Sequence, residues 1–479
     1  MSQHSPSPAD QRYVAHDWAG ALALYQQARD AEPALAAPNA LPLLIAHCRV
    51  ELAAEPTALA APDLPPATGS AREQALVKMV EGRALELCRA GDAVRAAVVL
   101  RLLVPYDTTM AETYRHALAP GRSAASLASR AGEPPFLRAL GIADLAIDAL
   151  KATHRGKRVL LVYRKFYPEG DPRQGEVINC LDVSATRFGL AVRRFAPPGD
   201  PSTIAPTLLQ TLLVEKPDLV VYDNQYPIGA GGDPDTVRDQ IEAVLATVRR
   251  QLGVRVVVSY MDIWQQAEHG PATMFRGLGD AFDLVQHGHP AVLGAGTPEQ
   301  NARTFCYVLP AWIPAASVPY GTVARACFVG GISWFNVARA VWWAETARRG
   351  LPIDFFESRH LEGPPRSDQA YADLFAQHQL ALNFTRRSGG PTILTGRSLD
   401  IPLAGGVLVE EHSEGTAFFM TPGTHYVPFE TLDDLATLIP DLLADAPRRE
   451  RLRAAARAWV ETYFTGDYFW AGILTRLWS

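Results

Sequence analysis

The residues best suited to chemistry form one short loop in the C-terminal third of the chain. Residues 386–391 carry two arginines, Arg386 and Arg387, followed by the pair Gly389 and Gly390. A guanidinium is a planar, permanently charged fork that matches phosphate oxygens, and glycine lets the backbone approach a ligand closely. The loop therefore predicts a site for a phosphate group.

A helix is expected directly after this loop, from about residue 392 to residue 403. Free N–H groups at its N-terminus, at Thr392, would favour an anion. Arg397 adds a third guanidinium, and the carboxylate of Asp400 can accept hydrogen bonds from a pair of sugar hydroxyls. Phosphate and sugar contacts side by side point to a nucleotide sugar as the ligand.

The flanking segments show how this loop is positioned. Residues 380–385 are a short apolar run that predicts a buried strand, and residues 407–410 predict another after Gly405 and Gly406. Strand, loop, helix and strand make one turn of a doubly wound α/β domain, whose ligands bind at the carboxyl ends of the strands. Glycine-rich loops also occur in such domains without a ligand, so a purely structural role is the alternative.

The composition indicates a globular protein of more than one domain. The chain has 479 residues, 48% of them hydrophobic and 20% charged, and one core rarely serves so long a chain. Its formal net charge of −6 argues against non-specific binding to nucleic acid, which needs a basic face. Five cysteines without a CxxC pair exclude a thiolate zinc site and indicate a reducing compartment. We expect a cytoplasmic protein without a transmembrane segment, either free or peripheral at the inner membrane face.

Residues 1–150 predict an all-α domain. Two segments with a helical period end at Pro33 and Pro105, about two tetratricopeptide repeats apart. A plain helical bundle is the alternative. The isolated histidines of this region are interpreted as structural or surface residues: His16, His47 and His116.

Residues 151–320 predict a Rossmann-like domain, because short β-branched runs alternate with helices as in a parallel sheet covered on both faces. The loops after its strands should share one edge and bind a ligand there. The candidates at this edge are Gly175, Glu176 and Asp223 for binding, and Asp262 and His287 as general base. A polar residue at a strand end also serves turns and helix caps, which is the alternative for each. His287 and His289 lack a third ligand at metal spacing, so no metal site is predicted.

Residues 321–479 predict a second Rossmann-like domain behind a proline-rich hinge at 310–320. Its segments match motifs of a known family: Phe328-Val329-Gly330 in one strand, Leu382-Asn383 in a later strand, and PG-x-x-x-V-x-F at 422–429. Residues 395–405, TGRSLDIPLAG, correspond to the family's helix of the form T-x-R-x-F-E-x-x-A-x-G. These motifs resemble the group-1 glycosyltransferases of GT-B fold, in particular the CgeB-like spore-maturation proteins. The resemblance covers about two thirds of the chain. It implies an α/β protein of GT-B fold, with two tandem Rossmann-like domains preceded here by the all-α helical domain.

The resemblance implies a glycosyltransferase (EC 2.4) that moves a sugar from a UDP-, GDP- or dTDP-sugar to a hydroxyl of a protein or glycan. The donor would bind the C-terminal domain and the acceptor the middle domain, at Gly175, Glu176 and Asp223, with the helical domain helping to recognise the acceptor. No metal or other cofactor is implied, because arginines and a helix N-terminus can carry the charge of the leaving diphosphate. The implied donor-binding residues are Gly330, Gly331, Arg386, Arg387, Gly389, Gly390, Thr392, Arg397 and Asp400.

Two positions depart from the family pattern. Asp400 stands where the family has a glutamate that holds the ribose, and Thr392 stands where related transferases have the first acid of an E-x7-E pair. The motif of retaining enzymes is thus incomplete, and the sequence leaves both stereochemical outcomes open. Only an inverting reaction needs Asp262 or His287 to deprotonate the acceptor.

Two other functions stay open at this stage. One is an epimerase or phosphorylase of the same architecture, although a phosphorylase needs a cofactor lysine and the chain has none after Lys216. The other is a non-catalytic scaffold with a degenerate GT-B domain, which would use the helical region to bind a protein. Nucleotide binding separates the scaffold from the transferase, because a ligand of the native state raises its thermal stability.

Overall fold

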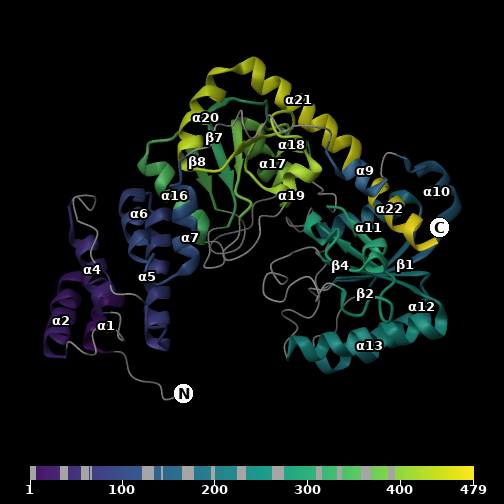
Figure 1. The fold of residues 1–479 in the computed structure, drawn as a ribbon, viewed down its shortest axis with the longest axis horizontal. Coiled ribbons are helices and arrows are strands. Elements are labelled where there is room, and N and C mark those ends of the chain that lie inside the picture. The colour runs from purple at the N-terminus through teal and green to yellow at the C-terminus, as the bar shows by residue number, and fades with distance from the viewer. Residues whose placement is uncertain are drawn as a thin grey trace.

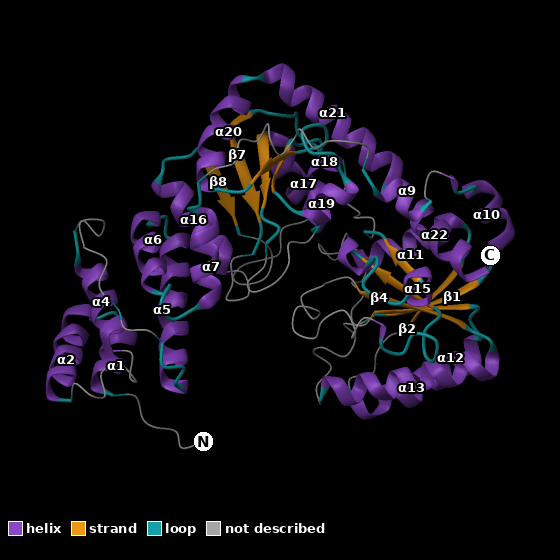
Figure 2. Cartoon of the chain, viewed as in Figure 1, coloured by secondary structure: helices purple, strands orange, loops and turns teal. Residues whose placement is uncertain are grey.

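The structure of this chain is a computed structural model, shown in Figures 1 and 2. It describes residues 7–32, 41–54, 64, 67–120, 134–141, 144–163, 177–195, 200–223, 233–260, 275–308, 315–331, 337–357, 368–386 and 394–478. The chain begins with a helical region, which is followed by a middle unit and a C-terminal unit, each built on a parallel sheet. The last helices lead from the C-terminal unit back to the middle unit. In Figure 1 the C-terminal unit lies between the helical region and the middle unit.

The helices of the N-terminal helical region bury apolar side chains in a shared core. Its helices are α1 (Pro8–Val14), α2 (Trp18–Ala31), α4 (Leu41–Leu52), α5 (Ala71–Arg89), α6 (Ala93–Leu102) and α7 (Thr108–Ala117). Four of these helices have an N-cap side chain that accepts a hydrogen bond from a backbone N–H of the first turn: Asp17 for α2, Ser70 for α5, Asp92 for α6 and Asp107 for α7. The helical character predicted for this region is confirmed, and its repeat type stays a prediction.

The core of the helical region continues into the C-terminal unit. Helix α16 (Val337–Arg348) contributes three residues to the same apolar cluster as α5 and α6: Ala340, Val341 and Ala344. Figure 1 shows α5, α6 and α7 beside α16. Arg101 of α6 reaches across this junction to the fully buried Glu345 of α16, at 2.7 Å. The helical region is therefore packed against the C-terminal unit.

The middle unit is built on one parallel sheet with the strand order β2-β1-β3-β4-β5-β6. Its strands are β1 (Arg158–Val162), β2 (Ala191–Phe195), β3 (Leu219–Asp223), β4 (Arg255–Tyr260), β5 (Leu284–His287) and β6 (Thr304–Cys306). The central strands are buried because helices cover both faces (Figure 2). The helices along this stretch are α9 (Phe136–Leu140), α10 (Ile147–His154), α11 (Val177–Phe188), α12 (Ile204–Glu215), α13 (Pro234–Leu252) and α15 (Pro298–Ala302), with the 3-10 turns η3 (Pro201–Thr203) and η5 (Pro290–Val292).

The C-terminal unit has a second parallel sheet, in the order β11-β10-β9-β7-β8. Its strands are β7 (Val323–Val329), β8 (Ile353–Phe356), β9 (His378–Asn383), β10 (Leu408–Glu411) and β11 (Val427–Phe429). Besides α16, its helices are α17 (Asp368–Gln377), α18 (Gly396–Ala404), α19 (Glu414–Phe419) and α20 (Leu432–Ala444). The chain thus has two parallel sheets with flanking helices, preceded in sequence by a helical region. This arrangement confirms the predicted fold class.

Helix α18 begins later than the sequence predicted, so the expected start at residue 392 is wrong. Its N-cap, Thr395, has an extended backbone with φ −99° and ψ 162°. The Thr395 hydroxyl lies 2.9 Å from the amide nitrogen and 3.2 Å from the amide oxygen of Asn383. These contacts hold Thr395 outside the helix. The first free N–H groups of α18 are therefore those of Gly396 and Arg397.

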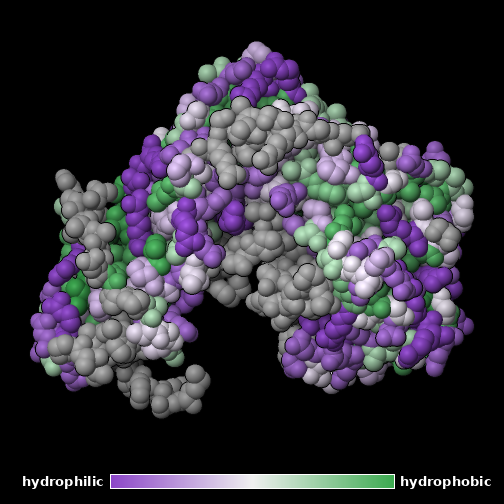
Figure 3. Space-filling model, in the orientation of Figure 1, coloured by the Kyte–Doolittle hydropathy of each residue, from purple (hydrophilic) through white to green (hydrophobic). Residues whose placement is uncertain are grey.

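The last two helices, α21 (Ala446–Tyr463) and α22 (Gly466–Trp478), return the chain to the middle unit (Figure 1). Helix α22 packs on α10 and α11 and buries Phe469 and Trp470. The hydroxyl of Tyr307, just after β6, donates to the backbone oxygen of Thr465 at 3.2 Å. In Figure 3 the outer surfaces of α13 and α21 are largely hydrophilic, as expected for helices with one buried face.

Candidate functional site

The carboxyl end of β9 places Asn383 at the centre of a buried hydrogen-bond network. Its amide nitrogen donates to Glu410 Oε2 at 2.9 Å and to Ser398 Oγ at 3.1 Å. Its amide oxygen accepts from Arg397 Nε at 2.9 Å. Asn383, Ser398 and Glu410 are fully buried, and such groups are costly unless they are bonded. The network therefore fixes the first turn of α18 relative to strands β9 and β10.

Glu410, on β10, is the acidic member of this network. Thr416 of α19 also donates its hydroxyl to the Glu410 carboxylate. Burial raises the pKa of Glu410 to about 7, although hydrogen bonds from Asn383 and Thr416 oppose the shift. Glu410 therefore changes charge near neutral pH inside the C-terminal unit.

Arg397 lies in the first turn of α18, at the carboxyl edge of the sheet. A cation at the N-terminus of a helix opposes the helix dipole, so this position is unfavourable for Arg397 by itself. Its guanidinium carbon lies 5.5 Å from the ring centre of Phe328. A Cβ atom at Gly330 would come within 2.5 Å of Phe328 Cζ and 3.4 Å of Arg397 Nη1, so the glycine after β7 leaves room for the Phe328 ring and lies beside the guanidinium. Gly330 and Arg397, two of the predicted donor-binding residues, therefore lie close together, and their contact with a donor stays a prediction.

Arg339 of α16 is a further cation at this edge. Its guanidinium carbon lies 5.8 Å from the ring centre of Phe328, and its Nη1 donates to the backbone oxygen of Gly331 at 3.1 Å. Arg339 is 6% exposed. Arg339 was not predicted from the sequence, because it lies on α16, far along the chain from the loop and helix that carry the predicted cations.

Arg386, the first residue of the cationic loop, is held by Glu411 at the end of β10. Glu411 Oε2 accepts the backbone N–H groups of Thr385 at 3.0 Å and of Arg386 at 2.9 Å. Glu411 Oε1 lies 3.3 Å from Arg386 Nε. Burial would raise the pKa of Glu411, but the nearby His116 ring and the hydrogen bond from the Arg386 backbone lower this pKa below its ordinary value. Glu411 is therefore a buried anion at neutral pH.

Asp400, the predicted sugar contact, lies on α18 one turn beyond Arg397. It is 8% exposed, and the hydroxyl of Tyr371 donates to its Oδ2 at 3.3 Å. The side chain of Asp400 also lies 3.5 Å from the position of a Cβ atom on Gly396. Asp400 is thus on the same helix and near the same edge as Arg397, and its sugar contact stays a prediction.

The carboxyl edge of the middle sheet carries Asp223 and His287. Asp223 is 3% exposed and lies near Tyr163, whose pKa is raised first by burial and then by this carboxylate. His287 Nδ1 accepts the backbone N–H of His289 at 2.8 Å. Burial, with His289 as a smaller cause, lowers the pKa of His287 to about 3. The ring is neutral at pH 7, the form that accepts a proton, and the same burial disfavours the imidazolium that would result.

The two units touch at these carboxyl edges. A Cβ atom at Gly415, in the first turn of α19, would come within 3.2 Å of His289 Nε2 and 3.5 Å of the Leu394 backbone nitrogen. Helix α19 also contacts η5, which follows His289. His289 is held by the backbone N–H of Ala291, which donates to its Nδ1 at 3.0 Å. The end of β5 therefore lies next to the segment that precedes α18.

Several predicted site residues lie outside the described part of the chain and stay predictions. They are Gly175, Glu176, Asp262, Arg387, Gly389, Gly390 and Thr392. Among the described residues, no group of three or more His, Cys, Asp or Glu side chains is arranged to hold a metal ion. No helix in the described ranges combines the length and the apolar character needed to cross a membrane.

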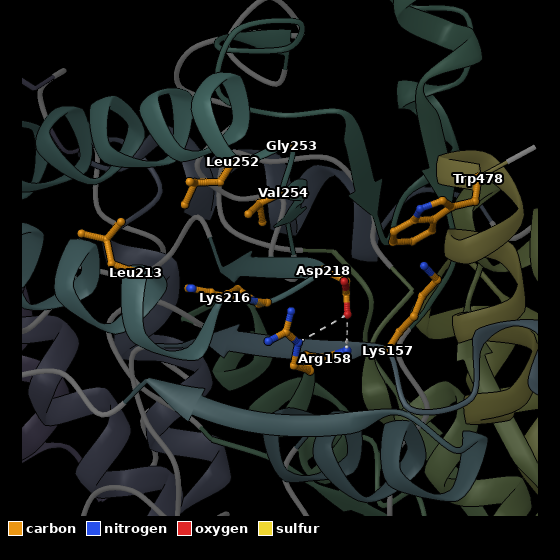
Figure 4. Close-up of a pocket in the computed structure, with 10 residues that line it drawn as sticks. Lys157, Arg158, Leu213, Lys216, Asp218, Leu252, Gly253, Val254 and Trp478 are labelled. Carbon is orange, nitrogen blue, oxygen red and sulfur yellow. Dashed lines mark hydrogen bonds and ion pairs between the residues drawn. The ribbon is translucent and has the colours of Figure 1, made fainter.

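A hollow of about 420 Å³ lies at the opposite, amino edge of the middle sheet (Figure 4). Its lining includes Lys157, Arg158, Lys216 and Trp478. Helices α12 and α13 end here, and the carbonyl groups at helix C-termini favour cations. Arg158 donates to the backbone oxygen of Glu215 at 3.1 Å, at the end of α12. We therefore interpret Arg158 as a cap of the α12 C-terminus, away from the predicted ligand edge.

Comparison with known proteins identifies part of the chain. Residues 329–475 match the model of a family described as "Glycosyl transferase-like". The chain contains a glycosyltransferase-like domain. This domain runs from the end of β7 to α22, and so includes Asn383, Arg386, Arg397 and Glu410. No curated protein matches the sequence.

Several solved structures resemble about two thirds of this chain at low sequence identity. Alr3699/HepE of Anabaena, in complex with UDP and glucose, is 13% identical with a TM-score of 0.46, over 67% of this chain and 99% of its own. Sucrose-phosphate synthase from Thermosynechococcus elongatus is 12% identical with a TM-score of 0.46, over 67% of this chain and 98% of its own. AviGT4, a glycosyltransferase involved in avilamycin A biosynthesis, is 14% identical with a TM-score of 0.43, over 67% of this chain and 98% of its own.

Proposed function

We propose that this protein is a GT-B glycosyltransferase that transfers a sugar from a nucleotide sugar to a hydroxyl group of a glycan or protein. The observation that carries the proposal is the fixed Arg397, inside the glycosyltransferase-like domain at residues 329–475. This cation occupies the N-terminal turn of a helix, where a bound anion would remove the unfavourable interaction with the dipole. A nucleoside diphosphate is such an anion.

Stabilisation of the leaving diphosphate is the main catalytic task in this proposal. Asn383 fixes Arg397 through Nε, and Glu411 fixes Arg386 through its backbone and side chain. Cations that are already oriented need no reorganisation when charge develops on the leaving group, which makes them effective in the transition state. We propose that these arginines serve in place of a metal ion, with Arg339 close by, and that Asp400 contacts the ribose or the sugar.

The acceptor is proposed to bind the carboxyl edge of the middle unit. The contact between His289 and Gly415 supports this proposal, because it sets that edge beside the start of α18. Asp223 lies at the same edge. An inverting reaction would require Asp262 or His287 as base, whereas a retaining one would not. We propose that the helical region assists in recognising the acceptor, and that the protein acts in the cytoplasm.

Thermal unfolding with UDP, GDP and dTDP tests this function. Binding at a hundred times Kd should stabilise the native state by about 2.7 kcal/mol and raise Tm by several degrees. At least one of the three nucleotides should do so in the wild type and should lose most of the effect in Arg397→Ala. If none of them raises Tm, the non-catalytic scaffold becomes the better account of this chain.

A further inference from the structure

The last turn of α7 is built into the C-terminal unit. Ala117 is fully buried, in one apolar cluster with Phe328, Trp342 and Phe384 of that unit. Its neighbour His116 lies edge-on to Trp342, with 6.5 Å between ring centres. A residue from the N-terminal helical region therefore stands beside the sheet that carries the proposed donor site.

His116 reaches the carboxylate that holds the cationic loop. Its Nε2 lies 3.4 Å from Glu411 Oε1, the same oxygen that Arg386 Nε approaches at 3.3 Å. The Glu411 side chain is 1% exposed, and that of His116 is 24% exposed. Glu411 Oε2 is occupied by the backbone N–H groups of Thr385 and Arg386. One buried carboxylate thus joins α7 to the first residues after β9.

A buried carboxylate depends on such partners. Removing one partner of a buried charge leaves the remaining charge poorly compensated, and the groups around it rearrange. If Glu411 moved, the backbone and the side chain of Arg386, the first residue of the cationic loop, would lose their contacts with its carboxylate. His116 is not needed to attach the helical region, because Arg101 binds Glu345 and Arg89 binds Glu357 at 2.8 Å elsewhere on that junction.

We infer that His116 is a positioning residue of the donor site, which holds Glu411 so that Arg386 is oriented toward the diphosphate. This inference rests on the proposed transferase function. It extends the donor site beyond the glycosyltransferase-like domain, because His116 lies more than two hundred residues before residue 329. The helical region is then part of the catalytic unit as well as a candidate for acceptor recognition.

Three variants of the full chain test this inference. His116→Leu keeps apolar bulk against Trp342 and removes the ring nitrogen. His116→Gln is the conservative variant, because its amide nitrogen can reach the position of Nε2. Arg101→Gln is the matched control, because it weakens the same junction at a distance from Glu411. The measurements are Tm, the Kd of whichever of UDP, GDP and dTDP binds the wild type best, and KM and kcat for the donor that carries this nucleotide.

His116→Leu should weaken nucleotide binding about tenfold and raise KM more than it lowers kcat, as expected for the loss of a charge-assisted contact. His116→Gln should restore most of the affinity. Arg101→Gln should lower Tm and leave Kd unchanged. Wild-type affinity in folded His116→Leu would overturn the inference, and so would an equal loss of affinity in Arg101→Gln.

Two further outcomes are decisive. If His116→Leu does not fold, Glu411→Gln tests the same link, because its amide oxygen still accepts the two backbone N–H groups but no longer attracts His116 or the Arg386 side chain. Unchanged affinity in Glu411→Gln would then overturn the inference. If the wild type binds none of the three nucleotides, the proposed function fails and the inference falls with it, whereas normal binding by the wild type and all variants removes the inference alone.

Discussion

Arg397 donates a hydrogen bond of 2.9 Å from Nε to the side-chain oxygen of Asn383. The nitrogen of the same amide is bonded to Glu410, so an arginine at the ligand edge is connected to a buried carboxylate through one side chain. A guanidinium held in this way has its plane set before a ligand arrives, and less side-chain entropy is lost on binding.

Arg397→Ala should lower kcat/KM at least tenfold, which corresponds to about 1.4 kcal/mol of transition-state stabilisation. Arg397→Lys is the matched control, because it keeps the charge but loses the planar fork and the donor that bonds Asn383. Steady-state kinetics with the preferred nucleotide sugar measure both. The lysine variant should fall between alanine and wild type, and an unchanged rate in Arg397→Ala would place the diphosphate elsewhere.

Asn383→Ala should destabilise the protein by about 2–3 kcal/mol, because Glu410 and Ser398 lose a partner in a fully buried network. Ser398→Ala removes one hydroxyl of the network, which has one hydrogen bond to Asn383, and should lower the free energy of unfolding by about 1 kcal/mol. Denaturant unfolding compares the two variants. A loss below that of Ser398→Ala would show that Asn383 is not the centre of the network.

The stability of the native state should depend on pH through Glu410. Its pKa is raised from 4.5 to about 7, so between these values the native state keeps a proton that the unfolded chain has lost. The contribution of Glu410 to stability is therefore fully present below pH 4.5 and is lost as the pH rises to 7.

Glu410→Gln cannot lose this proton, so its stability relative to the wild type should increase between pH 5 and pH 8, by up to about 3 kcal/mol. Denaturant unfolding of both proteins at a series of pH values measures the difference. The glutamine can still accept from Asn383, which limits other changes. A difference that stays constant over this range would mean that Glu410 does not titrate there.

Gly472→Ala should destabilise the packing of α22 against the middle unit. A Cβ atom at this position would lie 2.3 Å from Phe305 Cζ, and overpacking of a core costs about 1–3 kcal/mol. Gly82→Ala is the matched control inside α5, where a Cβ atom meets no atom within 4 Å, and it should stabilise by about 0.5–1 kcal/mol. Opposite shifts of Tm are expected, and a stabilised Gly472→Ala would contradict the observed packing of α22.

The sequence predicted those features that depend on neighbours along the chain. The two parallel α/β units follow from alternating apolar runs, and Gly330 and Arg397 were found through short motifs. The start of α18 was misplaced because Asn383, twelve residues earlier, holds Thr395 in an extended conformation. No local pattern links His116 to Glu411, since their contact depends on how α7 packs against α16. From the sequence alone, His116 is therefore interpreted as a structural or surface residue.

The position of a bound nucleoside diphosphate tests the central claim most directly. A crystal structure of the full chain soaked with the nucleotide that raises Tm most would give this position. We predict the diphosphate within hydrogen-bond distance of the Arg397 guanidinium, at the carboxyl edge of the C-terminal sheet. A diphosphate bound beside Lys157 and Arg158 at the amino edge of the middle sheet, with no nucleotide at Arg397, would contradict the account.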